Sequence, residues 1–240
     1  MVLDLVPLWT ALLALAVLYY VVFDGFDLGV RMLYGLAPDD EAWRNLIMNS
    51  VAPIWDGNET WVVFGSLGLL AAFSLAFAII IPAVYFPILI MLLALVFRGV
   101  AFEFRFRRPA LRRFWDGAFC GGSALATFAQ GIVLGTFIQG FEVDGRHFAG
   151  TSFDWMTPFA LLIGLALIFG YALLGAGWLI LKTEGALQQW ARRVGHLRLI
   201  AVLIAILAAA SGPPWRIPVL HSAGSRGRTS PFSRLSRSSR

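Results

Sequence analysis

Two carboxylates interrupt the first apolar stretch of the chain. Asp24 and Asp27 lie in the segment 23–29, and their spacing of three residues would place both on one face of a helix. A carboxylate inside a bilayer costs about 2.5–3.5 kcal/mol unless it faces protein or water. Two interpretations are open: the pair is hydrated near a helix end or paired with Arg31, or it takes part in proton transfer.

A second polar group opens the next apolar stretch. In the segment 53–61, Asp56 and Glu59 stand between Trp55 and Trp61. Acidic residues at the start of a helix are good capping residues, since they face its positive end. The patch is more polar than a cap requires, and half-buried carboxylates can pass protons between water and an interior site. Proton entry through Asp56 or Glu59 is therefore one hypothesis, and capping with partner contacts is the other.

Arg98 ends a nearly unbroken apolar run and, being always charged, needs a partner. Glu103 follows five residues later, and we predict a structural ion pair between Arg98 and Glu103. A carboxylate of the two preceding groups and a lipid phosphate reached by snorkelling are the alternatives.

Residues that ligate haem or metals are sparse. The three histidines, His147, His196 and His221, all lie outside the middle of the apolar stretches. Met91 and Cys120 are lone residues in apolar stretches, where packing is their common role. A single cysteine forms no disulfide within the chain. We therefore expect this chain to ligate no haem and no metal.

The composition predicts the elements that must hold these residues. Of 240 residues, 59% are hydrophobic and 14% charged, against roughly 45–50% and about 25% in soluble domains. An apolar run of about 20 residues crosses the hydrocarbon core as a helix. We therefore predict an all-α, polytopic transmembrane helix bundle with about six spans. The predicted spans are 6–34, 53–77, 79–102, 116–140, 157–181 and 197–211.

The distribution of basic residues predicts the orientation. Arginines concentrate at 105–113, and lysine and arginine recur at 182–198. Because basic residues stay on the cytoplasmic side, both loops should be cytoplasmic and the N-terminus periplasmic. Gly131 and Gly135 form a Gly-x-x-x-Gly pattern, which lets helices approach closely in lipid. That pattern does not distinguish contacts within the chain from contacts with a partner subunit.

The C-terminal segment differs from the rest. Residues 1–211 form the predicted bundle, whereas residues 212–240 are rich in Ser and Arg and carry six arginines without an acid. Without these six, 13 basic residues face 14 acidic ones, so the formal charge of +5 does not indicate nucleic-acid binding. We expect a disordered tail, either a basic lipid-touching segment or an out-of-frame end.

In combination, these motifs resemble one family: subunit II of cytochrome bd-type quinol oxidases, including the cyanide-insensitive branch. The segments that carry the resemblance are 23–29, 53–61, 98–105 and 130–135. The most specific is Trp-Asp-Gly-Asn-Glu-Thr-Trp, at 55–61. The resemblance covers about residues 5–210.

The resemblance implies a respiratory enzyme of the bacterial inner membrane that oxidises quinol and reduces oxygen to water. Haem b and haem d would be held by subunit I, and small accessory peptides often join the two subunits. Asp56 would line a proton route from the cytoplasm, with Glu59, Asp24 and Asp27 as further candidates. Some members hold a structural quinone, which would contact Trp55 and Asp56. Because members usually have eight spans, the resemblance also implies a truncated product.

Two other functions remain open. A secondary transporter or proton channel would use the same carboxylates at a broken helix and would work without a haem-bearing partner. A purely structural assembly subunit would need no proton path, so Asp56→Asn would leave quinol oxidation unchanged.

Overall fold

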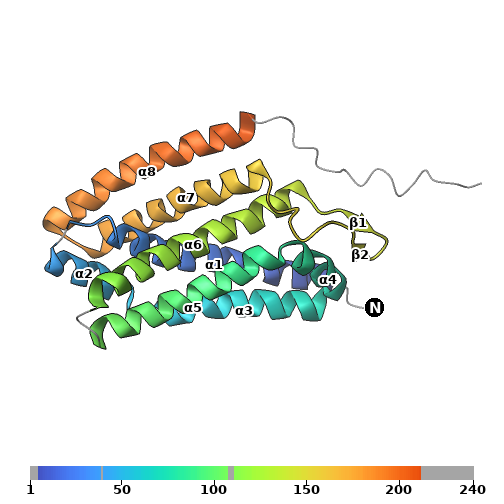
Figure 1. The fold of residues 1–240 in the computed structure, drawn as a ribbon, viewed down its shortest axis with the longest axis horizontal. Helices are drawn as coiled ribbons and strands as arrows, with labels where there is room; N and C mark the ends of the chain where they lie inside the picture. Colours follow the sequence, from blue (N-terminus) through green and yellow to red (C-terminus); the bar gives the residue numbers. More distant parts are fainter. Residues whose placement is uncertain (1–4, 39, 108–110, 212–240) are drawn as a thin grey trace, which may run out of the picture.

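The computed structural model is an elongated bundle whose long helices run along a common axis (Figure 1). It describes residues 5–38, 40–107 and 111–211, without the side chains of residues 55, 56, 102 and 106. The predicted all-α bundle is confirmed. The helices are α1 (Val6–Tyr34), α2 (Glu41–Val51), α3 (Trp55–Ala72), α4 (Ser74–Ala83), α5 (Tyr85–Arg107), α6 (Arg112–Gln139), α7 (Pro158–Lys182) and α8 (Gly185–Ser211).

Local chemistry explains several of the helix starts. Asp40 caps α2, its side chain accepting from the backbone N–H groups of Ala42 and Trp43. Thr157 caps α7 by accepting from the N–H of Ala160, and a proline occupies the first turn. An oxygen at the N-cap satisfies N–H groups that have no partner inside the helix, and proline there forgoes no bond.

Five described helices are long and apolar enough to cross a membrane: α1, α5, α6, α7 and α8. The chain is therefore a multi-pass membrane protein. The predicted second span corresponds to α3, whose polar first turns leave a shorter apolar stretch.

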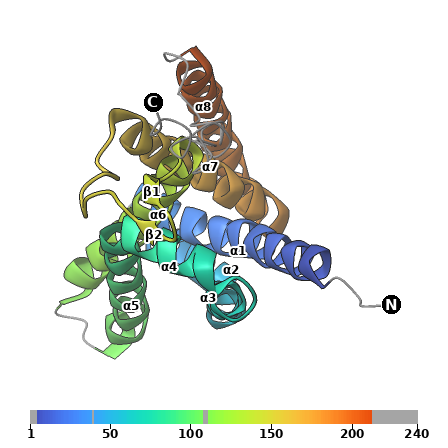
Figure 2. The same ribbon diagram turned by 90° about the vertical axis from the view of Figure 1, so that its right-hand side faces the viewer.

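Three predicted span boundaries are wrong: the end of the second span and the starts of the third and the last. The backbone breaks at Phe73, so residues 74–83 form the separate short helix α4, which lies across the end of the bundle (Figure 2), and the third span begins only at Tyr85. The last helix begins at Gly185, not at 197. Arg192 and Arg193 lie on the exposed side of α8. These charges lower the local mean hydropathy but do not end the helix.

Glycines set the closest helix crossings. A Cβ on Gly29 of α1 would stand 1.8 Å from the carbonyl oxygen of Tyr171 on α7, and one on Gly175 would stand 2.3 Å from the carbonyl carbon of Gly29. Only glycine permits this approach of two backbones. The core gathers around the second half of α1, where Leu28 and Leu33 are fully buried.

The end of the bundle near α4 also carries a small hairpin. Strands β1 (Val143–Asp144) and β2 (His147–Phe148) pair antiparallel, and Gly145 between them takes a positive φ of 60°. The C-terminal end of α5, the N-terminal end of α6 and the junction of α7 and α8 lie at the opposite end (Figure 1). The described arginines and lysine of the two predicted basic loops therefore share one end of the molecule.

Candidate functional site: a buried charge cluster

Five charged side chains from three helices meet inside the bundle. We call this group, Asp24, Asp27, Arg31, Glu59 and Arg98, the charge cluster. The three α1 residues share one face of that helix because they stand at positions i, i+3 and i+7. All members are fully buried except Glu59 of α3, whose side chain is 38% exposed. The cluster thus reaches from the interior to one exposed edge.

Arg98 of α5 joins the three helices. Its Nη1 donates to Asp24 Oδ1 at 3.3 Å and to Asp27 Oδ2 at 3.2 Å, and its Nη2 donates to Glu59 Oε1 at 2.6 Å. The planar guanidinium has several donors in a fixed fork, which suits this contact with separate carboxylates. One arginine therefore orients all three acids.

Arg31 neutralises the other side of Asp27. Its Nε donates to Asp27 Oδ1 at 3.0 Å, one helical turn away, and its guanidinium lies 4.8 Å from the centroid of the Phe119 ring. Pairing and a ring face both stabilise a cation without water. Of the alternatives left open for Asp24 and Asp27, hydration is wrong because both are fully buried, and pairing with Arg31 is confirmed for Asp27.

Neutral polar groups continue the cluster into α6. Gln130 Nε2 donates to the hydroxyl of Tyr20 at 2.6 Å and contacts Asp24 Oδ2 at 3.5 Å. Asn58 Nδ2 donates to the carbonyl oxygen of Phe23 at 3.1 Å. Within the described part of the chain, Arg98 Nε and Gln130 Oε1 are buried without a hydrogen-bond partner. The interior around Asp24 is therefore polar beyond its ion pairs.

The balance of charge in the cluster limits what it can do. Three carboxylates face two guanidinium groups, so full ionisation leaves one negative charge in excess. A buried charge without a counter-charge is costly. The cluster can lower that cost by binding one proton or by keeping the excess charge on Glu59 at the exposed edge. Such a group can take up and release a single proton.

The predicted ion pair between Arg98 and Glu103 is absent, and this prediction is wrong. Glu103 accepts instead from Arg107 Nη2 at 2.5 Å, and both side chains are exposed. Residues five apart on a helix point in directions about 140° apart, whereas residues four apart are neighbours. Arg98 faces the interior, while Glu103 lies on the outer side of α5.

The remaining predicted residues have different outcomes. Trp55 and Asp56 form the first turn of α3, one turn before Glu59, but their side chains lie outside the described part. Gly131 and Gly135 lie where α6 crosses α7. A Cβ on Gly131 would stand 2.5 Å from the Cα of Gly164, so this crossing is within the chain.

The methionine, cysteine and histidines considered above as haem or metal ligands lie in different parts of the structure. The hydroxyl of Tyr20 contacts the sulfur of Met91 at 4.0 Å, and the thiol of Cys120 donates to the carbonyl oxygen of Met32 at 3.5 Å. His147 lies in β2 and His196 in α8. Within the described residues, no three His, Cys, Asp or Glu side chains are grouped to hold a metal.

Sequence reasoning missed a second ionic centre at the basic end of the bundle. Asp116 Oδ1 accepts from the hydroxyl of Tyr34 at 2.6 Å and from Arg105 Nε at 2.5 Å. Arg44 lies 3.9 Å from the other carboxylate oxygen. Asp116 therefore joins α1, α2, α5 and α6. Its signal in the sequence is a lone acid directly after a run of arginines.

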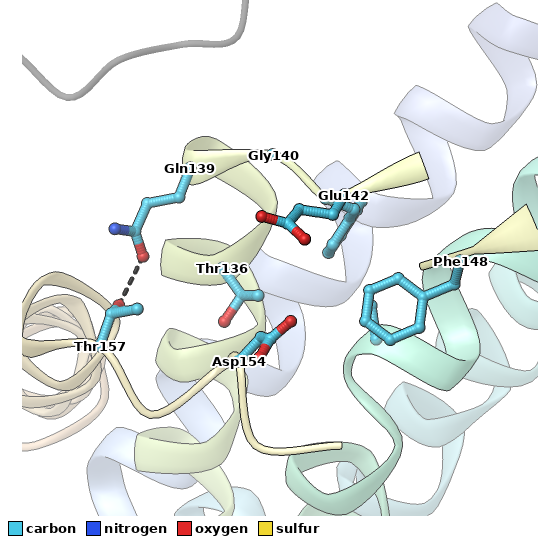
Figure 3. Close-up of a pocket in the computed structure, with 9 residues that line it drawn as sticks. Thr136, Gln139, Gly140, Glu142, Phe148, Asp154 and Thr157 are labelled. Atoms are coloured by element: carbon cyan, nitrogen blue, oxygen red, sulfur yellow. Dashed lines mark hydrogen bonds between the residues drawn. The ribbon is translucent and has the colours of Figure 1, made fainter. Parts of the chain in front are cut away.

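A small pocket of about 170 Å³, lined by both polar and apolar residues, lies at the opposite end. Figure 3 shows Glu142 and Asp154 beside it, with Thr157 hydrogen-bonded to Gln139. Asp154 already accepts from the backbone N–H of Thr151 at 2.8 Å. Its acids thus belong to the loops that close this end, and the charge cluster is the stronger candidate site.

Comparisons with known proteins agree on one family. The sequence model of the family described as cytochrome bd terminal oxidase subunit II matches residues 5–226. The match extends to residue 226, beyond residue 211 at which the predicted bundle ends and beyond the predicted extent of the resemblance. Residues 212–240 lie outside the described part.

Individual relatives are named as subunit 2 of a cytochrome oxidase or of a cytochrome bd ubiquinol oxidase. The chain is 31% identical over 209 residues to a probable cytochrome oxidase subunit 2 of Haemophilus influenzae, covering 84% of this chain and 55% of that protein. It is 31% identical over 207 residues to the cytochrome bd ubiquinol oxidase subunit 2 of Bacillus subtilis, covering 85% and 61%. For the cytochrome bd-I ubiquinol oxidase subunit 2 of Escherichia coli K12, the identity is 29% over 209 residues, covering 84% and 55%. The chain thus spans between about half and three fifths of the length of these relatives.

Proposed function

The chain belongs to the cytochrome bd terminal oxidase subunit II family, and from this premise we propose that it is the non-haem membrane subunit of a bd-type quinol oxidase. The complex would oxidise quinol and reduce oxygen to water in the respiratory chain. Haem b and haem d would be held by a partner subunit I and would supply the electron transfer and oxygen chemistry. Quinol and a small accessory peptide are further proposed partners.

The first role in this proposal is that of a scaffold for subunit I. The first half of α1 and most of α8 expose large apolar side chains, among them Leu8, Leu15, Ile204 and Leu207. Such faces need lipid or another apolar surface as cover. A partner subunit and the bilayer lipid would provide it.

The orientation follows from the charges. Arg105 and Arg107 are in the last turn of α5, and Arg112 is the first residue of α6; these two helix ends lie at the end of the bundle opposite the hairpin (Figure 1). Since basic residues favour the cytoplasmic side, this end would face the cytoplasm of a bacterial inner membrane, and the N-terminus would be periplasmic.

The second role is that of a proton path, and the observation that carries it is the position of Glu59. Its carboxylate is partly exposed, yet it accepts from Arg98, which also binds the buried Asp24 and Asp27. Asp24 lies ten residues before the end of α1, about 15 Å by helix rise. A proton would enter at Asp56, pass to Glu59 and be held within the charge cluster.

The family resemblance extends the proposal to a structural quinone near Trp55 and Asp56. The position of these residues in the first turn of α3, beside the exposed edge of the charge cluster, is compatible with such a contact. Their indole ring and carboxylate would contact the quinone headgroup.

The proton role is tested by Glu59→Gln in the assembled complex. Gln keeps the shape of the side chain and removes its charge. If this adds only about 1.4 kcal/mol to the barrier, turnover falls roughly tenfold, while the haem content stays unchanged. Glu103→Gln is the matched control, because Glu103 is an exposed acid outside the cluster. Unchanged quinol-driven oxygen uptake in both Glu59→Gln and Asp56→Asn would leave only the scaffold role.

A further inference from the structure

An apolar groove of about 680 Å³ runs between α5 and α6. Every residue that lines it is apolar or glycine. The lining residues used below are Leu93, Phe97 and Val100 on α5 and Gly117, Gly121 and Leu125 on α6. No residue of the charge cluster lines the groove, and its lining side chains offer no polar group to a ligand.

Two glycines create this hollow. A Cβ on Gly117 or Gly121 would meet nothing within 4 Å, whereas a Cβ on Gly29 or Gly131 would collide with a neighbouring backbone. Close helix packing within the described chain therefore does not explain the glycines at 117 and 121. Their effect is to keep space open along α6.

Both walls of the groove continue into an arginine at the basic end. Arg113 stands one turn before Gly117 on the same stripe of α6, and Arg107 stands two turns beyond Val100 on α5. Both side chains are exposed. Arg107 forms an ion pair with Glu103, while Arg113 forms no ion pair with any residue that the structure describes.

The length of the groove fits one leaflet. From Arg113 to Leu125 the helix rises about 18 Å, and half of the hydrocarbon core is about 15 Å. An occupant with an anionic head at the arginines would extend an apolar chain to about the middle of the bilayer.

We propose that this groove binds an anionic phospholipid, with its phosphate at Arg113 and Arg107 and one acyl chain between α5 and α6. Arginine binds phosphate oxygens through paired N–H donors, and basic residues beside a membrane helix attract anionic lipids. A transmembrane helix could fill the groove only if it also carried an acidic residue at the depth of the arginines. A phospholipid combines the anionic phosphate and the apolar acyl chain in one molecule. The inference is independent of the proposed oxidase role.

The test is lipid binding to the full chain, purified in mild detergent and measured by native mass spectrometry with added phosphatidylglycerol or phosphatidylcholine. We expect phosphatidylglycerol to bind about fivefold more tightly, since one arginine near the surface contributes about that factor. Arg113→Gln should bring the two lipids to near parity, and Arg113→Lys should keep the preference. Gly121→Leu, which fills the groove, should lower retention of both lipids.

Two control variants separate this site from general effects. Arg193→Gln removes an exposed arginine on α8, and Gly170→Leu fills open space on α7; both should bind lipid as the parent does. Equal binding of both lipids by the parent, or equal loss in Arg193→Gln, would overturn the proposal. Efficient cross-linking of Gly121→Cys to a partner helix in the assembled complex would also overturn it.

Discussion

Replacing Arg98 by methionine tests whether the charge cluster is a dry, paired unit. Its guanidinium donates to three carboxylates, two of which are fully buried. In Arg98→Met, Asp24 and Asp27 stay buried with Arg31 as their one remaining counter-charge in the cluster. Removing one partner of a buried ion pair costs about 3–5 kcal/mol. We therefore expect the free energy of unfolding to fall by about 3 kcal/mol or more, roughly a hundredfold in the equilibrium constant.

Reversible unfolding in mixed micelles of mild detergent and SDS, followed by tryptophan fluorescence and far-UV circular dichroism, measures this loss. Adding Asp24→Asn to Arg98→Met should recover at least half of it, because no fully buried carboxylate is then left without a counter-charge: Asp27 keeps its pair with Arg31, and the remaining excess charge lies on the partly exposed Glu59. The control, Glu103→Gln, removes an exposed pair of the kind that contributes about 0–1 kcal/mol. If Arg98→Met destabilises the protein no more than this control, water reaches the cluster and the argument from burial fails.

Two further substitutions test the packing around the site by the same unfolding measurement. Gly175→Ala should lower the free energy of unfolding by about 1–3 kcal/mol, because the new Cβ collides with the backbone of Gly29. Gly177→Ala, which has open space around it, should leave that free energy unchanged or raise it by up to about 1 kcal/mol. Equal effects of the two substitutions would contradict the close crossing of α1 and α7. Asp116→Asn should cost about 1.5–3 kcal/mol, since its carboxylate accepts charge-assisted hydrogen bonds, including one from Arg105 at 2.5 Å. A loss below about 0.5 kcal/mol would show that Asp116 does not join the helices at the basic end.

The types of residue in the site were predictable from sequence, because ionisable groups in apolar stretches are rare and expensive. Asp24, Asp27, Glu59 and Arg98 were all identified in this way, and the structure brings them together. Pairing of Arg98 with a carboxylate of the two preceding groups was one of the alternatives, and the structure confirms it, but the sequence did not select it over Glu103. Glu103 is near Arg98 along the chain, but which face of α5 meets α1 depends on tertiary packing.

The helix boundaries, too, were only partly predictable from the sequence. Hydropathy located the apolar stretches, yet it placed the start of the last helix at 197 because Arg192 and Arg193 lower the local average. A helix tolerates charges on an exposed side, so hydropathy alone does not mark its end. The break at Phe73 has no glycine or proline at that position, and so the sequence carried no local signal for it.

The spacing of the glycines predicted only part of their structural role. Gly131 and Gly135 were recognisable as a close-packing pattern. Spacing alone did not distinguish them from Gly117 and Gly121, four residues apart as well, which border an open groove. The difference lies in the neighbouring helix, which only the fold supplies.

The central claim is that this chain is the non-haem subunit of a bd-type quinol oxidase. Its most direct test is to co-express the chain with the haem-bearing subunit I from the same genome and to purify through this chain in mild detergent. The reduced-minus-oxidised haem spectrum and quinol-driven oxygen uptake are then recorded together. The account predicts co-eluting haem with oxygen uptake that Glu59→Gln lowers at constant haem content. A chain that inserts in the membrane but brings down no haem would contradict it.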